Sequence, residues 1–319
     1  MIDTPSHPVF SYAEACDRGK KREDNQDHVR HVTTALGELL IVADGIGGYG
    51  GGAIASRMVV DSFETWFGSL SAETPPAQAI ADAAAHANAN IFEAAAHGDP
   101  DNARMGSTVV VALITQGAEG LQAWLGHVGD SRAYLCRAGQ ISRLTHDHST
   151  VQALIDQGAI RPEEAASHPD RSVLLRSVGH TEQCEIEMSV VTLHQDDSLL
   201  LCSDGLWGFV AEEAMEQVLG DPGIDAQGAA GALLNLALEA GGLDNIGIEL
   251  VRVGGAAPAR LNTVQAHPGL ESRWGGFGRI LIYVLLVVAI GAAFGWYAIQ
   301  RHWIPGIRHT LPSSPSTGN

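Results

Sequence analysis

Short apolar runs of strand length recur along the first 253 residues, and turns rich in glycine and polar residues separate them. Runs of this kind predict β-strands. We expect strands at residues 9–16, 28–34, 38–43, 107–114, 121–127, 132–137, 140–144, 184–193, 197–203 and 246–253. Because most of these runs follow one another through short turns, the sheets should be largely antiparallel, with helices packed against them. Strands 121–127 and 132–137 should form a tight hairpin through "HVGDSRAY".

Four stretches carry the 3.6-residue periodicity of amphipathic helices. Two occupy about 211–220 and 225–240. The other two stretches lie earlier in the chain and place about one apolar residue per turn on a broad face. The apolar face of the earlier stretch consists of Ile54, Met58, Phe63, Phe67 and Leu70, and that of the later one of Ile80, Ala84, Ala87, Ile91 and Ala95. The polar stretch at about 149–177 should be only partly helical.

The end of the chain has a different composition. Residues 254–278 are rich in Gly, Pro and Ala without a period and predict a flexible linker. Ile280–Ile299 then contains 20 residues without a charge, enough to span a bilayer core of roughly 30 Å. The alternative is a buried core helix, but only a polar tail follows. We expect a folded domain at 1–253, a transmembrane helix at 279–300 and a short tail at 301–319.

The chain of 319 residues has a formal net charge of −18, and the part up to Val253 alone carries about −22. Such an acidic body argues against nucleic acid as a partner, because affinity for nucleic acid depends on Lys and Arg that neutralise phosphates. The four cysteines (16, 136, 184 and 202) contain no C-x-x-C and fit a reducing compartment. The start, "MIDTPSHPVF", has no signal-peptide pattern, so we expect the body to stay in the cytoplasm, tethered to the inner membrane by a single span.

The stretch "LLIVADGIGGYGGG" (39–52) satisfies the dinucleotide-binding pattern G-x-G-x-x-G. A dinucleotide fold requires a parallel second strand about 30 residues on, with an acidic residue for the ribose. Here two helical patterns come before the next strand, and the carboxylate of Asp44 would repel a pyrophosphate. We therefore interpret the stretch as a carboxylate held on a strand beside uncovered backbone.

The same arrangement recurs at Asp130, Asp204 and Asp244, each next to a glycine or a turn at the tip of a strand. Clustered carboxylates repel one another unless cations neutralise them. Oxygen ligands favour the hard cations Mg²⁺ and Mn²⁺. The alternative metal ligands are the histidines of "HDHS" (146–149), which lie in a polar segment without a nearby cysteine; His127 is expected to pack in a strand near the site.

Seven segments occur in the order and spacing of the bacterial branch of the protein phosphatase 2C family, and the chain resembles that family over residues 10–253. They are "GKKREDNQD" (19–27), "VADGIGGYGGG" (42–52), "MGSTVVVAL" (105–113), "HVGDSRAYL" (127–135), "LTHDHS" (144–149), "CSDGLWGFV" (202–210) and "DNIG" (244–247). The resemblance implies an α+β fold in which an antiparallel β-sandwich is flanked by helices, the α-β-β-α architecture. It also implies a metal-dependent phosphatase acting on serine and threonine.

By this resemblance Asp44 bridges two Mn²⁺ or Mg²⁺ ions, the Gly45 carbonyl adds a ligand, and Asp204 and Asp244 complete the first metal. Asp130 matches a residue that holds a weaker third metal. The resemblance further implies that Asp27 binds metal-coordinated water and that Arg22 grips the substrate phosphate, although Arg22 alone could equally be a surface arginine of the run "KKR" (20–22).

Three positions depart from the family pattern. Ile46 replaces a histidine proposed as general acid in many eukaryotic members, Tyr49 stands where bacterial members often have histidine, and Gln26 replaces a glutamate. None of these changes removes a direct metal ligand. The segment 147–177 matches the flap that covers the active site in the family. The alternative is a surface loop that has no role at the active site.

The leading hypothesis is a phosphoserine/phosphothreonine protein phosphatase that works by direct hydrolysis and opposes a membrane-bound Ser/Thr kinase. A catalytically silent phosphoprotein-binding scaffold of the same fold is the competing hypothesis. Hydrolysis of a small phosphorylated metabolite is the third.

Overall fold

The computed structural model describes residues 10–48, 50–99, 102–117 and 120–254. All of them belong to one compact unit, Met1–Arg260. Tyr49 and the expected transmembrane helix and tail lie outside the described residues, as does the expected linker apart from Gly254. Within the described ranges, no helix has both the length and the apolar composition needed to cross a bilayer.

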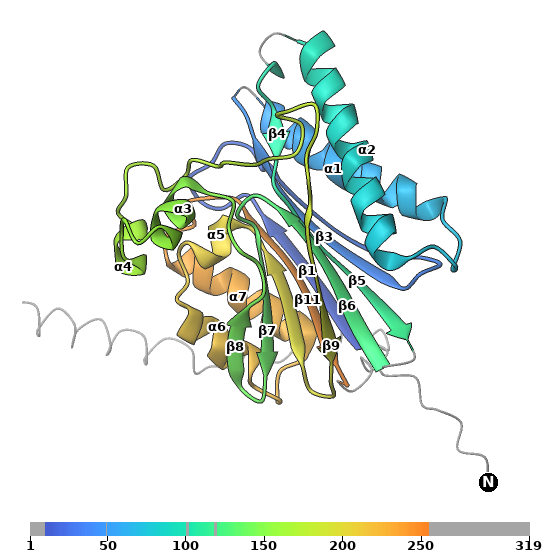
Figure 1. The fold of residues 1–319 in the computed structure, drawn as a ribbon. Helices are drawn as coiled ribbons and strands as arrows, with labels where there is room; N and C mark the ends of the chain where they lie inside the picture. Colours follow the sequence, from blue (N-terminus) through green and yellow to red (C-terminus); the bar gives the residue numbers. More distant parts are fainter. Residues whose placement is uncertain (1–9, 49, 100–101, 118–119, 255–319) are drawn as a thin grey trace, which may run out of the picture. The chain divides into compact units, whose positions relative to one another are not determined.

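Two antiparallel sheets form the centre of this unit (Figure 1). The first contains, in spatial order, β1 (Phe10–Asp17), β11 (Ile246–Val253), β10 (Ser198–Cys202), β7 (Arg132–Arg137) and β8 (Gln140–Arg143). The second contains β2 (Asp27–Thr33), β3 (Glu38–Ile46), β5 (Val109–Gly117), β6 (Gly120–Val128) and β9 (Glu187–Leu193), and the short β4 (Gly106–Ser107) pairs with the end of β3. The strand that we expected at 107–114 is thus divided into β4 and β5.

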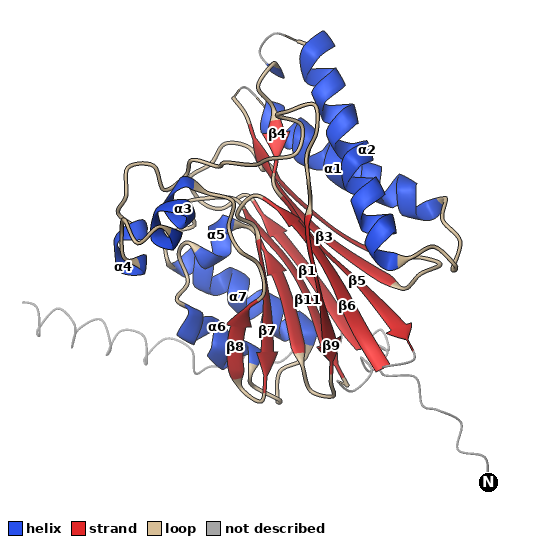
Figure 2. Cartoon of the chain, viewed as in Figure 1, coloured by secondary structure: helices blue, strands red, loops and turns tan. Residues whose placement is uncertain are grey.

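Figure 2 shows the helices on the outer sides of the two sheets. They are α1 (Gly51–Gly68) and α2 (Pro76–His97) against the second sheet, and α5 (Asp204–Trp207), α6 (Glu212–Leu219) and α7 (Ala226–Glu239) against the first. The insert between β8 and β9 carries α3 (Thr150–Asp156) and α4 (Pro162–Ala165). The α-β-β-α fold expected for residues 1–253 is therefore confirmed for the described residues.

Three apolar layers hold these elements together, because alternate residues of each strand point to opposite faces. On β3, Leu39 and Ile41 pack against α1 and α2, whereas Leu40 and Val42 pack between the sheets. A third layer joins the first sheet to α5, α6 and α7. Cys136 and Cys202 are buried in that layer, as their apolar surroundings in the sequence predicted.

The hairpin expected at "HVGDSRAY" is wrong, because β6 and β7 belong to different sheets. Gly129 makes the crossing with φ +100°, and a Cβ atom there would lie 2.6 Å from the Thr108 side chain. Only glycine adopts this conformation without strain at such close range. The crossing leaves Asp130 at the edge where the two sheets meet.

The predicted apolar face of α1 is only partly correct. Phe63 and Phe67 are buried, but Ile54 is 44% exposed and the smaller Ala55 and Val59 take the place expected for it. The rotation of α1 is set where it starts, because a Cβ atom on Gly52 would lie 2.7 Å from the Gly45 carbonyl oxygen. The face of α2 predicted from Ile80 to Ile91 is buried.

Candidate functional site

Five aspartates from distant parts of the chain meet at one edge of the sandwich. Asp27 and Asp44 are direct partners across β2 and β3. Asp130 follows the crossing after β6, Asp204 begins α5 directly after β10, and Asp244 lies just before β11. Charge repulsion from the other four acts on Asp44. The structure therefore brings together all five aspartates that the sequence assigned to metal binding.

Burial and mutual repulsion disfavour the ionised form of four of these carboxyl groups, those of Asp27, Asp44, Asp130 and Asp204. Loss of solvation, followed by repulsion from neighbouring aspartates, raises the pKa of Asp27 to about 7, of Asp204 to about 6 and of Asp130 to about 8. The same two causes raise the pKa of Asp44 well above its ordinary value. Divalent cations would remove this cost by neutralising the cluster. Because carboxylate oxygens are the ligands that Mg²⁺ and Mn²⁺ prefer, the residues present fit such ions.

Glycine lets the backbone approach closely beside two of the aspartates. A Cβ atom on Gly45, next to Asp44, would lie 2.0 Å from the Gly52 carbonyl oxygen. A Cβ atom on Gly205, next to Asp204, would lie 1.7 Å from the Asn245 carbonyl oxygen. Neither position tolerates a side chain, so the Asp-Gly pairs are required by packing and are more than turn signals.

Hydroxyl groups that the sequence did not single out fix the aspartates. Ser203 Oγ donates a 2.6 Å hydrogen bond to Asp27 Oδ2 and accepts one of 2.8 Å from the Gly247 N–H. The Asp44 N–H donates to Thr108 Oγ1 at 3.0 Å. Ser203 and Thr108 lie inside the motifs "CSDGLWGFV" and "MGSTVVVAL". Position within a motif was the only sequence signal for them.

Arg22 lies at the margin of the cluster. Its Nη2 donates to Asp244 Oδ2 at 2.7 Å, and its side chain is 53% exposed. This hydrogen bond is the main cause of a raised Arg22 pKa, so the guanidinium stays charged. Asn245 anchors the surrounding loop, because its Nδ2 donates to the carbonyl oxygens of Arg18 and Asp24. The arginine is thus held beside the aspartates and is not a free surface residue.

A second arginine forms part of the wall. Arg132 makes two-pronged hydrogen bonds to Asp147 through Nε and Nη2, at 3.0 and 2.6 Å, and its guanidinium carbon lies 3.4 Å from the ring centre of Trp207. Trp207 Nε1 donates to the Asp130 carbonyl oxygen at 3.0 Å. The start of the flap, at Asp147, is thereby connected to the turn that carries Asp130.

A cavity of about 920 Å³ opens between the flap and the aspartate cluster. Arg22, Asp130, Asp204 and Asp244 line one side, and residues of α3 and α4 line the other. The cavity is within the size range of ligand sites. The segment expected as a flap therefore faces the predicted catalytic residues.

The histidines form a separate group. His127, His148 and Glu187 place one ligand atom each within 4.8 Å of one another. The Gly129 N–H donates to His148 Nδ1 at 3.2 Å, so Nε2 carries the proton and donates to Glu187 at 3.2 Å. A protonated nitrogen cannot bind a metal, which disfavours this group as a metal site. His146 instead pairs with Asp156 at 2.8 Å.

Comparison with known proteins agrees with this geometry. Residues 18–233 match the family model described as protein phosphatase 2C, and the chain belongs to that family. The serine/threonine protein phosphatase PstP of Mycobacterium tuberculosis is 36% identical over 248 residues, 77% of this chain and 45% of PstP. Protein phosphatase PhpP of Streptococcus pneumoniae is 34% identical over 241 residues, 74% of this chain and 94% of PhpP.

Solved structures resemble the described fold. The catalytic domain of PstP in complex with two manganese ions has a TM-score of 0.68 and 31% identity, covering 77% of this chain and 99% of that one. The Streptococcus agalactiae serine/threonine phosphatase has a TM-score of 0.70 at 31% identity, covering 76% and 99%. The chain spans about half the length of the PstP sequence that it matches.

Proposed function

We propose that this chain is a metal-dependent phosphatase that hydrolyses phosphoserine and phosphothreonine in proteins. One observation carries the proposal. Asp44 pairs with the buried Asp27 and lies close to Asp204 and Asp244, and these last two line a cavity together with the charged Arg22. The carboxylate oxygens of the aspartates can hold divalent ions, and the neighbouring guanidinium of Arg22 can bind a phosphate group. Together they suit hydrolysis of a phosphate ester.

Asp44, Asp204 and Asp244, together with the Gly45 carbonyl, would hold two Mn²⁺ or Mg²⁺ ions, and Asp130 would help to hold a third. Bound ions lower the pKa of a coordinated water and offset charge on the phosphoryl oxygens. The carboxylate of Asp27 is held by Ser203 and can accept a proton from water at the site. PstP and PhpP carry names that describe protein phosphatases.

Arg22 would bind and orient the substrate phosphate. Its planar guanidinium has several donors, and only Nη2 is engaged with Asp244. The remaining donors can take two phosphate oxygens in parallel. Ile46 has no proton to donate, so water would protonate the leaving alkoxide. No side chain needs to become phosphorylated in this scheme.

The test is hydrolysis of a phosphothreonine peptide with Mn²⁺, with Mg²⁺ and with EDTA. Turnover that depends on the metal and is lost in Asp44→Asn supports the proposal. Metal-dependent binding of the peptide without turnover would instead identify the scaffold. Turnover of small phosphoesters but of no peptide would favour the metabolite phosphatase.

We further propose that the body is cytoplasmic and tethered to the inner membrane through Ile280–Ile299, opposing a Ser/Thr kinase at the same membrane. The uncharged stretch of 20 residues supports the tether. The four cysteines are free thiols, which suits a reducing compartment. Fractionation of cells that express the full chain, and a reporter fused after Asn319, test this topology.

A further inference from the structure

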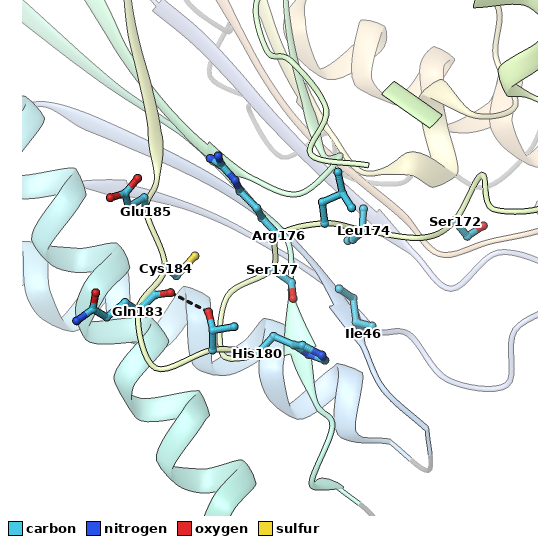
Figure 3. A pocket seen from close by; sticks show the side chains of 11 residues that line it. Ile46, Ser172, Leu174, Arg176, Ser177, His180, Gln183, Cys184 and Glu185 are labelled. Atoms are coloured by element: carbon cyan, nitrogen blue, oxygen red, sulfur yellow. Dashed lines mark hydrogen bonds between the residues drawn. The ribbon is translucent and has the colours of Figure 1, made fainter. Parts of the chain in front are cut away.

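A second pocket lies beside the end of the flap segment (Figure 3). Its volume is about 380 Å³, within the range of ligand sites. Ile46 lines it from the end of β3, and the segment 172–185 supplies its other lining residues. In Figure 3 the side chains of Leu174 and Arg176 lie above His180, with Ile46 on one side and Cys184 on the other.

The pocket adjoins the catalytic cavity. Ser172 lines both the 380 Å³ pocket and the 920 Å³ cavity that holds Asp130, Asp204 and Asp244. Ile46 follows Asp44 by two residues on the same strand, a separation of roughly 7 Å. An extended peptide advances about 3.5 Å per residue. A side chain two or three residues from a phosphoresidue at Asp44 would therefore reach the pocket.

Backbone hydrogen bonds fix the wall of the pocket. Ser107 in β4 and Val178 exchange two of them, of 3.0 and 2.8 Å, and Gly106 next to Ser107 pairs with Ile46. The buried Asn88 of α2 accepts from the Gly179 N–H at 2.7 Å and donates to the Thr181 carbonyl oxygen at 3.0 Å. The segment is thus attached to both β4 and α2.

The lining combines apolar surface with one unpaired cation. Ile46 and Leu174 are partly exposed, and Leu175 is 60% exposed. Within the described parts of the chain, the side chain of Arg176 has no hydrogen-bond or ion-pair partner. Glu185 also lines the pocket but does not pair with Arg176. In a protein with 37 acidic and 19 basic residues, an unpaired arginine at an opening favours an acidic ligand.

We propose that this pocket is a substrate-recognition subsite for two side chains of the phosphoprotein. An apolar side chain two residues from the phosphoresidue and an acidic side chain three residues from it occupy the subsite. The apolar side chain packs on Ile46, Leu174 and Leu175, and the acidic side chain pairs with Arg176. The inference rests on the proposed phosphatase function and assigns that function a class of phosphoprotein substrate.

The test measures kcat/KM for phosphothreonine peptides that differ only at these two positions. One set of peptides carries the two residues on the amino side of the phosphothreonine, and a second set carries them on the carboxyl side. Three combinations are compared in each set, Leu-Glu, Leu-Lys and Ser-Glu, in which the first residue is two positions and the second three positions from the phosphothreonine. In one of the two sets we expect Leu-Glu to exceed Leu-Lys by about threefold to fivefold, the scale of a partly exposed ion pair. We expect Leu-Glu to exceed Ser-Glu by about fivefold through the buried apolar surface.

Two variants separate the two contributions. Arg176→Glu should invert the Glu/Lys preference, and Leu175→Asn should reduce the Leu/Ser preference. Both residues are exposed, so neither change should impair folding, and turnover of p-nitrophenyl phosphate should stay at the wild-type value. Arg57→Glu makes the same charge change at a side chain of α1 that is 72% exposed, and it should leave both preferences intact.

The subsite is overturned if phosphopeptides are hydrolysed and the Glu/Lys ratio is the same in wild type and Arg176→Glu. It is also overturned if Arg57→Glu shifts that ratio as strongly as Arg176→Glu, because the effect would then come from net charge. Failure of wild type to hydrolyse any phosphopeptide with Mn²⁺ would overturn the phosphatase function itself. The two failures are therefore distinguishable.

Discussion

Arg22 and Asp244 are 222 residues apart in the sequence, yet Arg22 Nη2 donates a 2.7 Å hydrogen bond to Asp244 Oδ2. A proposed metal ligand thus holds the proposed phosphate-binding group. The carboxylate has a second oxygen, Oδ1, which accepts from the Asn245 N–H at 2.9 Å. Asp244 therefore joins the loop of Arg22 to the edge of the sandwich where the five aspartates meet. A change at either Arg22 or Asp244 should affect substrate binding.

Replacing Arg22 should weaken binding of the phosphate. A hydrogen bond to a charged group contributes about 1.5–3 kcal/mol, so Arg22→Ala should lower kcat/KM for a phosphopeptide about 10-fold to 100-fold, mostly through KM. Arg22→Lys should recover part of the loss, because lysine keeps the charge without the planar fork. Steady-state kinetics with Arg57→Ala as control measure this effect. Unchanged KM for phosphopeptide in Arg22→Ala would show that the arginine is only a surface residue.

Asp44→Asn keeps the shape of the side chain and removes a charge from the centre of the cluster. We expect a loss of at least ~100-fold in turnover with Mn²⁺, the scale for a group that organises an electrostatic site. The repulsion between Asp44 and the other four aspartates is then absent, so the variant should unfold at a higher temperature than wild type in EDTA and gain less from Mn²⁺. Thermal unfolding with and without Mn²⁺ measures both effects. An unchanged Mn²⁺-induced shift would rule out Asp44 as a ligand.

The ion pair between Arg132 and Asp147 is buried, with side chains 14% and 5% exposed. Asp147→Ala would leave a buried guanidinium without its carboxylate, which should cost about 3–5 kcal/mol in the free energy of unfolding. Asp147→Leu combined with Arg132→Met should restore much of that loss, because both charges are then absent. Urea denaturation measures the three free energies. A cost below about 1 kcal/mol for Asp147→Ala would mean that solvent reaches the Arg132 guanidinium and replaces the carboxylate.

Glu249 gives the protein a dependence on pH away from the metal site. It lies fully buried on β11, and neither carboxylate oxygen has a hydrogen-bond partner among the described residues. Burial, with repulsion from Glu14, raises its pKa from 4.5 to about 9. Between these pH values the folded protein keeps a proton that the unfolded chain releases, so the free energy of unfolding falls as pH rises.

Glu249→Gln removes this ionisation and keeps the shape. The variant should match wild type near pH 4.5 and become progressively more stable than wild type up to pH 9, by at most about 1.4 kcal/mol per pH unit. Urea denaturation at four pH values measures the difference. A difference that does not change with pH would show that Glu249 is ionised in the folded protein. Glu14→Gln, on the exposed partner position of β1, serves as the control and should show a much smaller dependence.

The strands and the clustered aspartates of the candidate site could be predicted from the sequence because both depend on local patterns. Alternation and apolar runs located β3 and β10, and an aspartate followed by glycine lies within the last three residues of β3 and just after the end of β10. The crossing at Gly129 could not be predicted, since a short turn between two strands looks the same whether they pair or enter different sheets. The bond from Ser203 to Asp27 joins residues 176 apart, and no periodicity reports such a contact. The lack of a partner for Arg176 within the described residues likewise depends on the surroundings of its side chain, which no local pattern reports.

The last prediction concerns the proposed tether. The final strand, β11, ends at Val253, pairs with β1 over its whole length and pairs with β10 from Ile248 to Arg252, so truncation after Gly254 should preserve the fold of the body. We expect the truncated protein to hydrolyse p-nitrophenyl phosphate at the rate of the full chain, since the aspartates and Arg22 all precede the cut. The full chain should sediment with membranes and the truncated chain should not. Full-length Asp44→Asn is the matched control and should sediment like wild type, because the tether is independent of catalysis. Recovery of the full chain in the soluble fraction would disprove the tether, whereas loss of small-substrate turnover on truncation would mean that residues after Gly254 support the active site.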